Sequence, residues 1–212
     1  HKGIHAFNCK VHGKAAHSSL TPEGVNAIEY AARLIVFIND LAAQLKQRQD
    51  LDTAFDVPFS SLSVNTIRGG NAVNIIPALC EFQFDYRNLP HMQPQDIVKP
   101  IETYIRQVLE PQMQAVDAAA RIELVHATNV PALPEAEARL LHELVEQLVG
   151  ESGRHKVAYA TEGGQFWQAG IHTVICGPGH IAQAHKPDEF VSLAQLERCD
   201  RFIEQLIAAQ HQ

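Results

Sequence analysis

The stretch CEFQFDYR (residues 80–87) alternates apolar and polar side chains along its whole length. The apolar set consists of Cys80, Phe82, Phe84 and Tyr86. Because successive side chains of a strand point to opposite faces, this alternation is typical of a β-strand with one buried face. We expect the strand to begin at about Ile75. The stretch therefore predicts a sheet that is covered on one side only.

The segments on either side of this strand follow the order β-α-β-β-α-β. Strands are expected at residues 4–13, 58–68, 75–87 and 121–126. One helix is expected from Thr21, as its N-cap, to about residue 47. A second helix follows the proline-rich segment 94–100, where Pro100 predicts a kink or a late start. This order is that of the ferredoxin-like fold, a four-stranded antiparallel sheet with two helices on one face, so residues 1–128 are expected to form an α+β domain.

The remaining residues, 129–212, alternate helical and strand-like segments after a hinge-like TNVPALP stretch (residues 128–134). Helices are expected at residues 135–149 and 192–209, the second capped by Ser192, and a short helix or turn is expected at residues 166–169. Strands are expected at residues 156–160 and 172–176. Two strands alone would leave long unpaired edges. We therefore expect an incomplete α/β domain over residues 129–212, whose missing strands lie upstream of His1.

Composition sets limits on the class of protein. The chain has 212 residues, with 46% hydrophobic and 19% charged residues, which is typical of a globular protein and excludes disordered, collagen-like and coiled-coil chains. A net charge of −7 without a basic stripe argues against nucleic acid and anionic membranes as partners. We see no membrane span and no signal peptide. The four scattered cysteines favour reduced thiols in the cytoplasm.

Histidine occurs 12 times, and two of these residues lie in segments that could carry chemistry. His185 lies in the run CGPGHIAQAHKPDE (residues 176–189), beside Asp188 and Glu189. A carboxylate next to an imidazole favours metal ligation, whereas the alternative is a surface histidine in a polar loop. His17 lies between a predicted strand and a predicted helix, where it could donate to an oxyanion or act as a capping or solvent-exposed residue.

Three further residues are candidates for substrate binding. Asn74 in GGNAVNIIP and Arg87 in FDYR occupy neighbouring polar positions of a predicted turn and strand, and an arginine fork suits a carboxylate. The alternative for Arg87 is a surface pair with Asp85. Glu162 in TEGGQF could recognise a cationic group or cap the next helix.

Together, these segments resemble the dinuclear-zinc amidohydrolases, a family that includes deacetylases, desuccinylases, aminoacylases and carboxypeptidase G. The matching segments are HGKAAHSSLTPEGVNAI, GGNAVNIIP, FDYR, TEGGQFWQAGI and CGPGHIAQAHKPDEF. The last two look most like the acetylornithine deacetylase branch. The resemblance implies a lid domain that dimerises, over residues 1–128, and the C-terminal part of a catalytic domain, over residues 129–212.

The resemblance also implies a role for each candidate. His185 matches a ligand of the two zinc ions (cobalt is an alternative), and His17 matches a lid histidine that stabilises the oxyanion in the partner subunit's site. Asn74 and Arg87 match the residues that hold the carboxylate of the substrate. Gly177 and Gly179 match a turn that lines the substrate pocket, and Glu162 matches an acid that would bind the ornithine ammonium.

The family's other metal ligands and its general base have no counterpart among these residues. A catalytic zinc site needs several protein ligands, so we expect these 212 residues to be inactive alone. The implied reaction of the whole enzyme is removal of the acetyl group from N-acetylornithine, a step of arginine biosynthesis. Two alternatives remain open: a non-catalytic dimerisation module, and a related N-acyl amino acid deacylase such as a succinyl-diaminopimelate desuccinylase.

Overall fold

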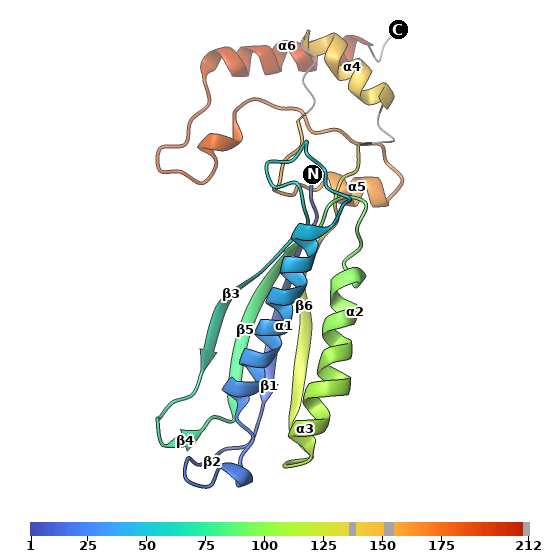
Figure 1. The fold of residues 1–212 in the computed structure, drawn as a ribbon. Helices are drawn as coiled ribbons and strands as arrows, with labels where there is room; N and C mark the ends of the chain where they lie inside the picture. The colour runs from blue at the N-terminus through green and yellow to red at the C-terminus, as the bar shows by residue number, and fades with distance from the viewer. Residues whose placement is uncertain (136–138, 151–154, 210–212) are drawn as a thin grey trace. The chain divides into compact units, whose positions relative to one another are not determined.

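The computed structural model describes residues 1–135, 139–150 and 155–209, drawn as a ribbon in Figure 1. These residues form two compact units. The first unit contains His1–Pro134 together with Lys156–Gly164, and the second contains the rest. The first unit thus includes residues 129–134 and 156–164 in addition to the 128 residues of the predicted lid domain.

A four-stranded antiparallel sheet forms the body of the first unit, with the strand order β3-β5-β1-β6 (Figure 1). The strands are β1 (Ile4–His12), β3 (Ser61–Gly69), β5 (Leu79–Arg87) and β6 (Arg121–Val130). Two helical segments cover one face, α1 and the run from α2 to α3. The predicted ferredoxin-like arrangement is therefore confirmed.

The predicted continuous strand from residue 75 to 87 is wrong at one point. Ile75–Ile76 forms a separate short strand, β4, which pairs with β2 (Ala16–His17), and β5 begins only at Leu79. Pro77 lies between the two strands, and a proline has no N–H to donate to a strand ladder. The chain therefore changes partner at this residue and forms a small two-stranded sheet beyond the main one.

The first long helix begins later than the sequence predicted. Thr21–Glu23 forms a separate 3₁₀ turn, and α1 runs from Ala27 to Gln47. Its N-cap is Asn26, whose side chain accepts hydrogen bonds from the backbone N–H groups of residues 28 and 29. The prediction of Thr21 as the cap is wrong, because an asparagine five residues later satisfies the first free amides of the helix.

The second helical run passes through its proline. Its parts are α2 (Gln95–Tyr104), the π-helical turn η2 (Ile105–Leu109) and α3 (Glu110–Gln114). Pro100 lies inside α2, so the expected late start is wrong. Buried Glu110 joins this run to the sheet, because its carboxylate accepts the backbone N–H of Ile122 at 2.9 Å.

The hydrophobic core lies between the sheet and the helices. Phe84 on β5 is 2% exposed and stacks on Phe7 of β1, with 4.8 Å between ring centroids. Leu34 and Ile38 of α1 and Ile101 of α2 belong to the same cluster. The four apolar residues of the stretch 80–87 all belong to it, which confirms the face predicted from their alternation.

The described residues after Pro134, which belong mainly to the second unit, contain helices but neither of the predicted strands. The helical elements are α4 (Arg139–Val149), α5 (Gly163–Gln168), the 3₁₀ turn η3 (Ile181–Gln183) and α6 (Leu193–Ala209). The strands expected at residues 156–160 and 172–176 are wrong: both segments are irregular. An isolated strand leaves its backbone groups unpaired, and neither segment pairs with a strand in the described part of the chain.

Ser192 caps α6, since its Oγ atom accepts the N–H of Gln195 at 3.3 Å, as predicted. The helix predicted from residue 135 is present as α4 from Arg139, and residues 136–138 lie outside the described residues. None of the helices in the described ranges has the length and apolar character that a membrane span needs.

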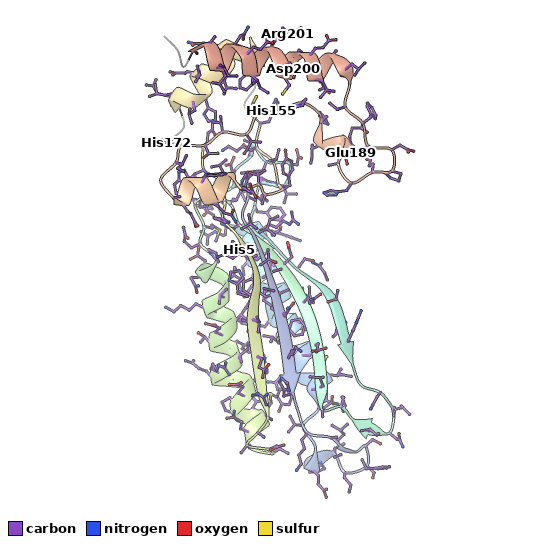
Figure 2. The ribbon with its side chains drawn as sticks, turned by 180° about the vertical axis from the view of Figure 1, so that it is seen from behind. His5, His155, His172, Glu189, Asp200 and Arg201 are labelled. Atoms are coloured by element: carbon purple, nitrogen blue, oxygen red, sulfur yellow. The ribbon has the colours of Figure 1, made fainter. Side chains whose placement is uncertain are left out.

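A buried histidine gives the first unit a pH-dependent stability. His5 is 1% exposed; its Nε2 atom lies 2.9 Å from Oδ1 of Asn88 and its Nδ1 atom 3.2 Å from Nε2 of His126 (Figure 2 labels His5). Burial lowers the pKa of His5, although the Asn88 contact opposes this shift. The unfolded chain therefore binds the proton more readily, and stability is lost as the pH falls below about 6.5.

Urea unfolding at pH 7.5 and 5.5 checks this expectation. The wild-type chain should be less stable at pH 5.5, and His5→Gln should reduce the difference between the two pH values. His172→Gln removes an exposed histidine and should leave the wild-type difference unchanged. An unchanged difference in His5→Gln would contradict the assignment.

Candidate functional site

His17 and Asn74 lie together at one end of the first unit. His17 belongs to β2 and pairs with Ile75 of β4, and the backbone N–H of Ser18 donates to the carbonyl oxygen of Asn74 at 3.0 Å. Both His17 and Asn74 are exposed. We call the segments 16–20 and 71–76 the apex of the first unit; Figure 1 shows β2 and β4 there, at the end of the sheet away from the N-terminus.

The apex also exposes large apolar side chains. Leu20 is 47% exposed and Val73 is fully exposed, although both are residues that proteins usually cover. The imidazole of His17 contacts only Ser19 among the described residues, with 2.7 Å between Nδ1 and Oγ of Ser19. Sequence reasoning did not single out Ser19, although it follows His17 by two residues, a spacing at which serine readily bonds to a nearby side chain.

Arg87 lies at the opposite end of the sheet from the apex. Its Nε atom donates to Oδ1 of Asp85 at 3.1 Å, and its Nη1 atom donates to the carbonyl oxygen of Ala158 at 3.2 Å. The alternative noted for Arg87, a pair with Asp85, is thus present. Because the guanidinium remains partly exposed, this pairing leaves part of the fork available to a ligand.

Asn74 and Arg87 are not neighbours within one chain, contrary to the sequence expectation. β5 is nine residues long, so its two ends are about 27 Å apart. Asn74 lies beyond the first end and Arg87 is the last residue of the strand. One carboxylate cannot contact both side chains of the same molecule. Their assignment to a shared site stays a prediction, and it requires two chains.

Glu162 is an exposed residue in the segment that follows Ala158 in the first unit. The Oγ1 atom of its neighbour Thr161 accepts the N–H of Gly163, the first residue of α5, at 3.1 Å. Gly164 approaches the chain so closely that a Cβ atom there would lie 2.1 Å from the carbonyl oxygen of Pro131. This contact fixes the turn that carries Glu162.

Gly177, Gly179 and His185 all belong to the second unit. Gly177 lines a cavity of about 440 Å³ together with Cys176, Arg198, Cys199 and Phe202. Gly179 has φ +103°, a left-handed conformation that favours glycine. The position of Gly177 agrees with a pocket-lining role, which remains a prediction.

His185 also has a left-handed backbone, with φ +61°. Its backbone N–H, and not its ring, donates to a carboxylate oxygen of Glu189 at 3.2 Å (Figure 2 labels Glu189). A metal site needs several donor side chains. In the described parts of the chain, no three His, Cys, Asp or Glu residues are grouped to hold a metal ion, so these residues do not form a zinc site by themselves.

The family description "peptidase dimerisation domain" of the M20 group matches residues 1–113, which is more than half of the chain. The chain belongs to the M20 family. The matched residues cover β1 to α2 and most of α3, and so include His17, Asn74 and Arg87. The other candidates lie beyond the match.

Relatives of this M20 chain extend the similarity to almost its whole length. It is 32% identical to the acetylornithine deacetylase of Myxococcus xanthus over 98% of the chain and 53% of the relative. It is 34% identical to the acetylornithine deacetylase of Proteus mirabilis over 98% of the chain and 51% of the relative. It is 36% identical to the acetylornithine deacetylase of Edwardsiella ictaluri over 91% of the chain and 48% of the relative. The chain thus spans about half the length of the curated relatives it matches.

Solved structures agree with the fold. A putative aminohydrolase from methicillin-resistant Staphylococcus aureus has a TM-score of 0.73 at 17% identity, over 97% of this chain and 51% of the other. A tripeptidase from Staphylococcus aureus has a TM-score of 0.65 at 20% identity, over 95% and 50%. At such low identity the similarity concerns the fold alone.

Proposed function

We propose that this chain supplies the lid and the C-terminal catalytic segment of a metal-dependent amide hydrolase that converts N-acetylornithine to ornithine and acetate. The observation that carries the proposal is the match to acetylornithine deacetylases along 98% of the chain. The reaction would serve arginine biosynthesis. The four cysteines form no disulfide, which suits a cytoplasmic enzyme.

We propose that the working enzyme is a homodimer. The apex, with His17 and Asn74, and the Arg87 end lie on opposite ends of one sheet, so a site that uses all three residues needs a second chain. The exposed apolar side chains of the apex, including Val73, suit a surface that another subunit covers. The outer edge of β3 pairs with no other strand in the described residues and offers a second contact surface.

Each candidate residue then has one role. His17 reaches the partner's site and donates to the oxyanion that forms when the acetyl carbonyl is attacked. Arg87 of one chain and Asn74 of the other hold the α-carboxylate of the substrate. Glu162 pairs with the side-chain ammonium of the substrate. Gly177 and Gly179 line the substrate pocket. His185 is one metal ligand, and the remaining ligands must come from outside the described residues.

The role of Arg87 leads to a specific expectation. We call this chain, joined to the half of its relatives that it does not match, the completed enzyme. In the completed enzyme, Arg87→Ala should raise KM for substrates that carry an α-carboxylate by about tenfold or more. The reason is that a charge-assisted hydrogen bond contributes about 1.5–3 kcal/mol. KM for an analogue in which that carboxylate is an amide should change far less. Arg139→Ala is the control, because it removes an exposed arginine that pairs, among the described residues, only with Glu143 on the surface of α4; it should leave both values unchanged. Equal KM values for the acid in wild type and Arg87→Ala would remove the assignment.

The proposal predicts different behaviour for the chain alone and for the completed enzyme. The 212 residues with added zinc should not hydrolyse N-acetylornithine, because the described donors do not group into a metal site. The completed enzyme, by contrast, should hydrolyse N-acetylornithine in preference to N-succinyl-diaminopimelate. Preference for the succinyl substrate would favour the related deacylase. Activity of the chain alone would refute the proposal that the remaining metal ligands lie outside the described residues.

A second candidate function is a dimerisation module without catalysis. The dimerisation-domain match over residues 1–113 favours it, because these residues lie within a compact unit that has its own hydrophobic core. Analytical ultracentrifugation with a zinc assay separates the two. The dimerisation module is favoured if the 212 residues form a dimer without zinc and the completed enzyme is inactive. The hydrolase is favoured if the completed enzyme binds stoichiometric zinc and is active.

A further inference from the structure

The ring of His17 receives two contacts at the same nitrogen. The backbone N–H of Ser19 donates to Nδ1 at 3.2 Å, and Oγ of Ser19 lies 2.7 Å from Nδ1. A backbone amide is always a donor, so Nδ1 must be the acceptor. A neutral imidazole that accepts at Nδ1 carries its proton on Nε2.

The turn that carries these groups is braced by backbone hydrogen bonds. The N–H of Leu20 donates to the carbonyl oxygen of His17 at 2.8 Å, and the N–H of Ser18 donates to that of Asn74 at 3.0 Å. The pairing of β2 with β4 adds a further support on the same side. The hydroxyl of Ser19 and the ring of His17 are therefore held in one short turn, and their contact does not depend on a distant element.

We propose that Ser19 is a positioning residue that selects, between the two tautomers of the neutral His17 ring, the one with the proton on Nε2. The inference rests on the proposed function, in which His17 donates to an oxyanion. Only a ring nitrogen that carries hydrogen can donate, and among the described residues the hydrogen-bond contacts of the ring are all at Nδ1, not at Nε2. Ser19 thus leaves the free nitrogen of the exposed ring as the donor. A ring with the proton on Nδ1 would present a lone pair to the oxyanion and would repel it.

Nitrogen NMR on the 212-residue chain tests this inference. The chain is labelled with ¹⁵N and studied at a pH well above the ordinary histidine range. We expect the wild-type Nδ1 of His17 to be unprotonated and to couple across the hydrogen bond to the Ser19 amide nitrogen. Ser19→Ala removes the hydroxyl donor and should raise the ratio of the Nδ1-protonated to the Nε2-protonated form about two- to tenfold, the effect of one hydrogen bond.

Two matched variants complete the experiment. Ser18→Ala removes the neighbouring hydroxyl, and Ser19→Thr keeps one at the contact; both should retain the wild-type ratio. In the completed enzyme, Ser19→Ala should lower kcat with little change in KM, and Ser19→Thr should restore kcat. A wild-type ring protonated on Nδ1, or equal ratios in Ser19→Ala and Ser18→Ala, would overturn the inference. These spectra require no hydrolysis, so failure of the proposed function would appear separately, as wild-type turnover in His17→Ala.

Discussion

Replacing His17 by alanine in the completed dimer should lower kcat about 100- to 1000-fold, the usual cost of losing one oxyanion donor. The substrate is held by other residues, so KM should change little. The fold should be retained, because the exposed side chain of His17 hydrogen-bonds only to Ser19 in the described residues and the pairing of His17 with Ile75 involves the backbone. Initial rates with N-acetylornithine over a range of concentrations give both constants.

Ser18→Ala is the control for this change at the apex. It alters a neighbouring exposed side chain and leaves the backbone bond to Asn74 in position. Its kcat should match that of the wild-type enzyme. A His17→Ala enzyme with wild-type turnover would contradict the oxyanion role, whatever its effect on substrate binding.

Replacing Phe84 by alanine should destabilise the first unit by about 3–5 kcal/mol, the range for large aromatic side chains removed from a core. Phe84 is 2% exposed on the central strand β5, and its ring stacks on Phe7. Its truncation removes that contact and leaves a cavity between the sheet and the helices. The free energy of unfolding from urea titration measures the loss.

Val125→Ala is the matched control on the same sheet. Val125 lies on β6 and is 52% exposed, so its truncation should cost less than about 1 kcal/mol. A similar loss in the two variants would mean that burial does not distinguish these sites. A loss below about 1 kcal/mol for Phe84→Ala would contradict the position given to the core.

The fold of the first unit could be predicted because its strands carry a strong local signal. The alternation at residues 80–87 indicates both the strand and its buried face. The ends of elements were less predictable, since they depend on single competing groups: Asn26 displaces Thr21 as the cap, and Pro77 divides a strand. The segments at residues 156–160 and 172–176 have strand-like composition, but a strand also needs a neighbour, which composition does not supply.

The candidate site was predictable residue by residue but not in its geometry. The segments around His17 and Asn74 indicated functional residues, and the structure brings these two together through the pairing of β2 and β4. Spacing of 13 residues suggested that Asn74 and Arg87 are neighbours, but the intervening β5 separates them by its full length. Ser19 was missed because its role is a hydrogen bond to the side chain of His17, two residues earlier. Such a local hydrogen bond produces no recognisable sequence pattern.

A mixing experiment tests most directly whether His17 acts across the dimer. Completed enzymes that carry either His17→Ala or His185→Ala should each have little activity; they are then mixed and allowed to exchange subunits. In a mixed dimer, the subunit with intact His185 receives the intact His17 of its partner. Random exchange should therefore restore about a quarter of wild-type activity, because half of the dimers are mixed and each has one complete site. No activity above that of the two parents would contradict the account, since it would mean that both histidines serve one chain.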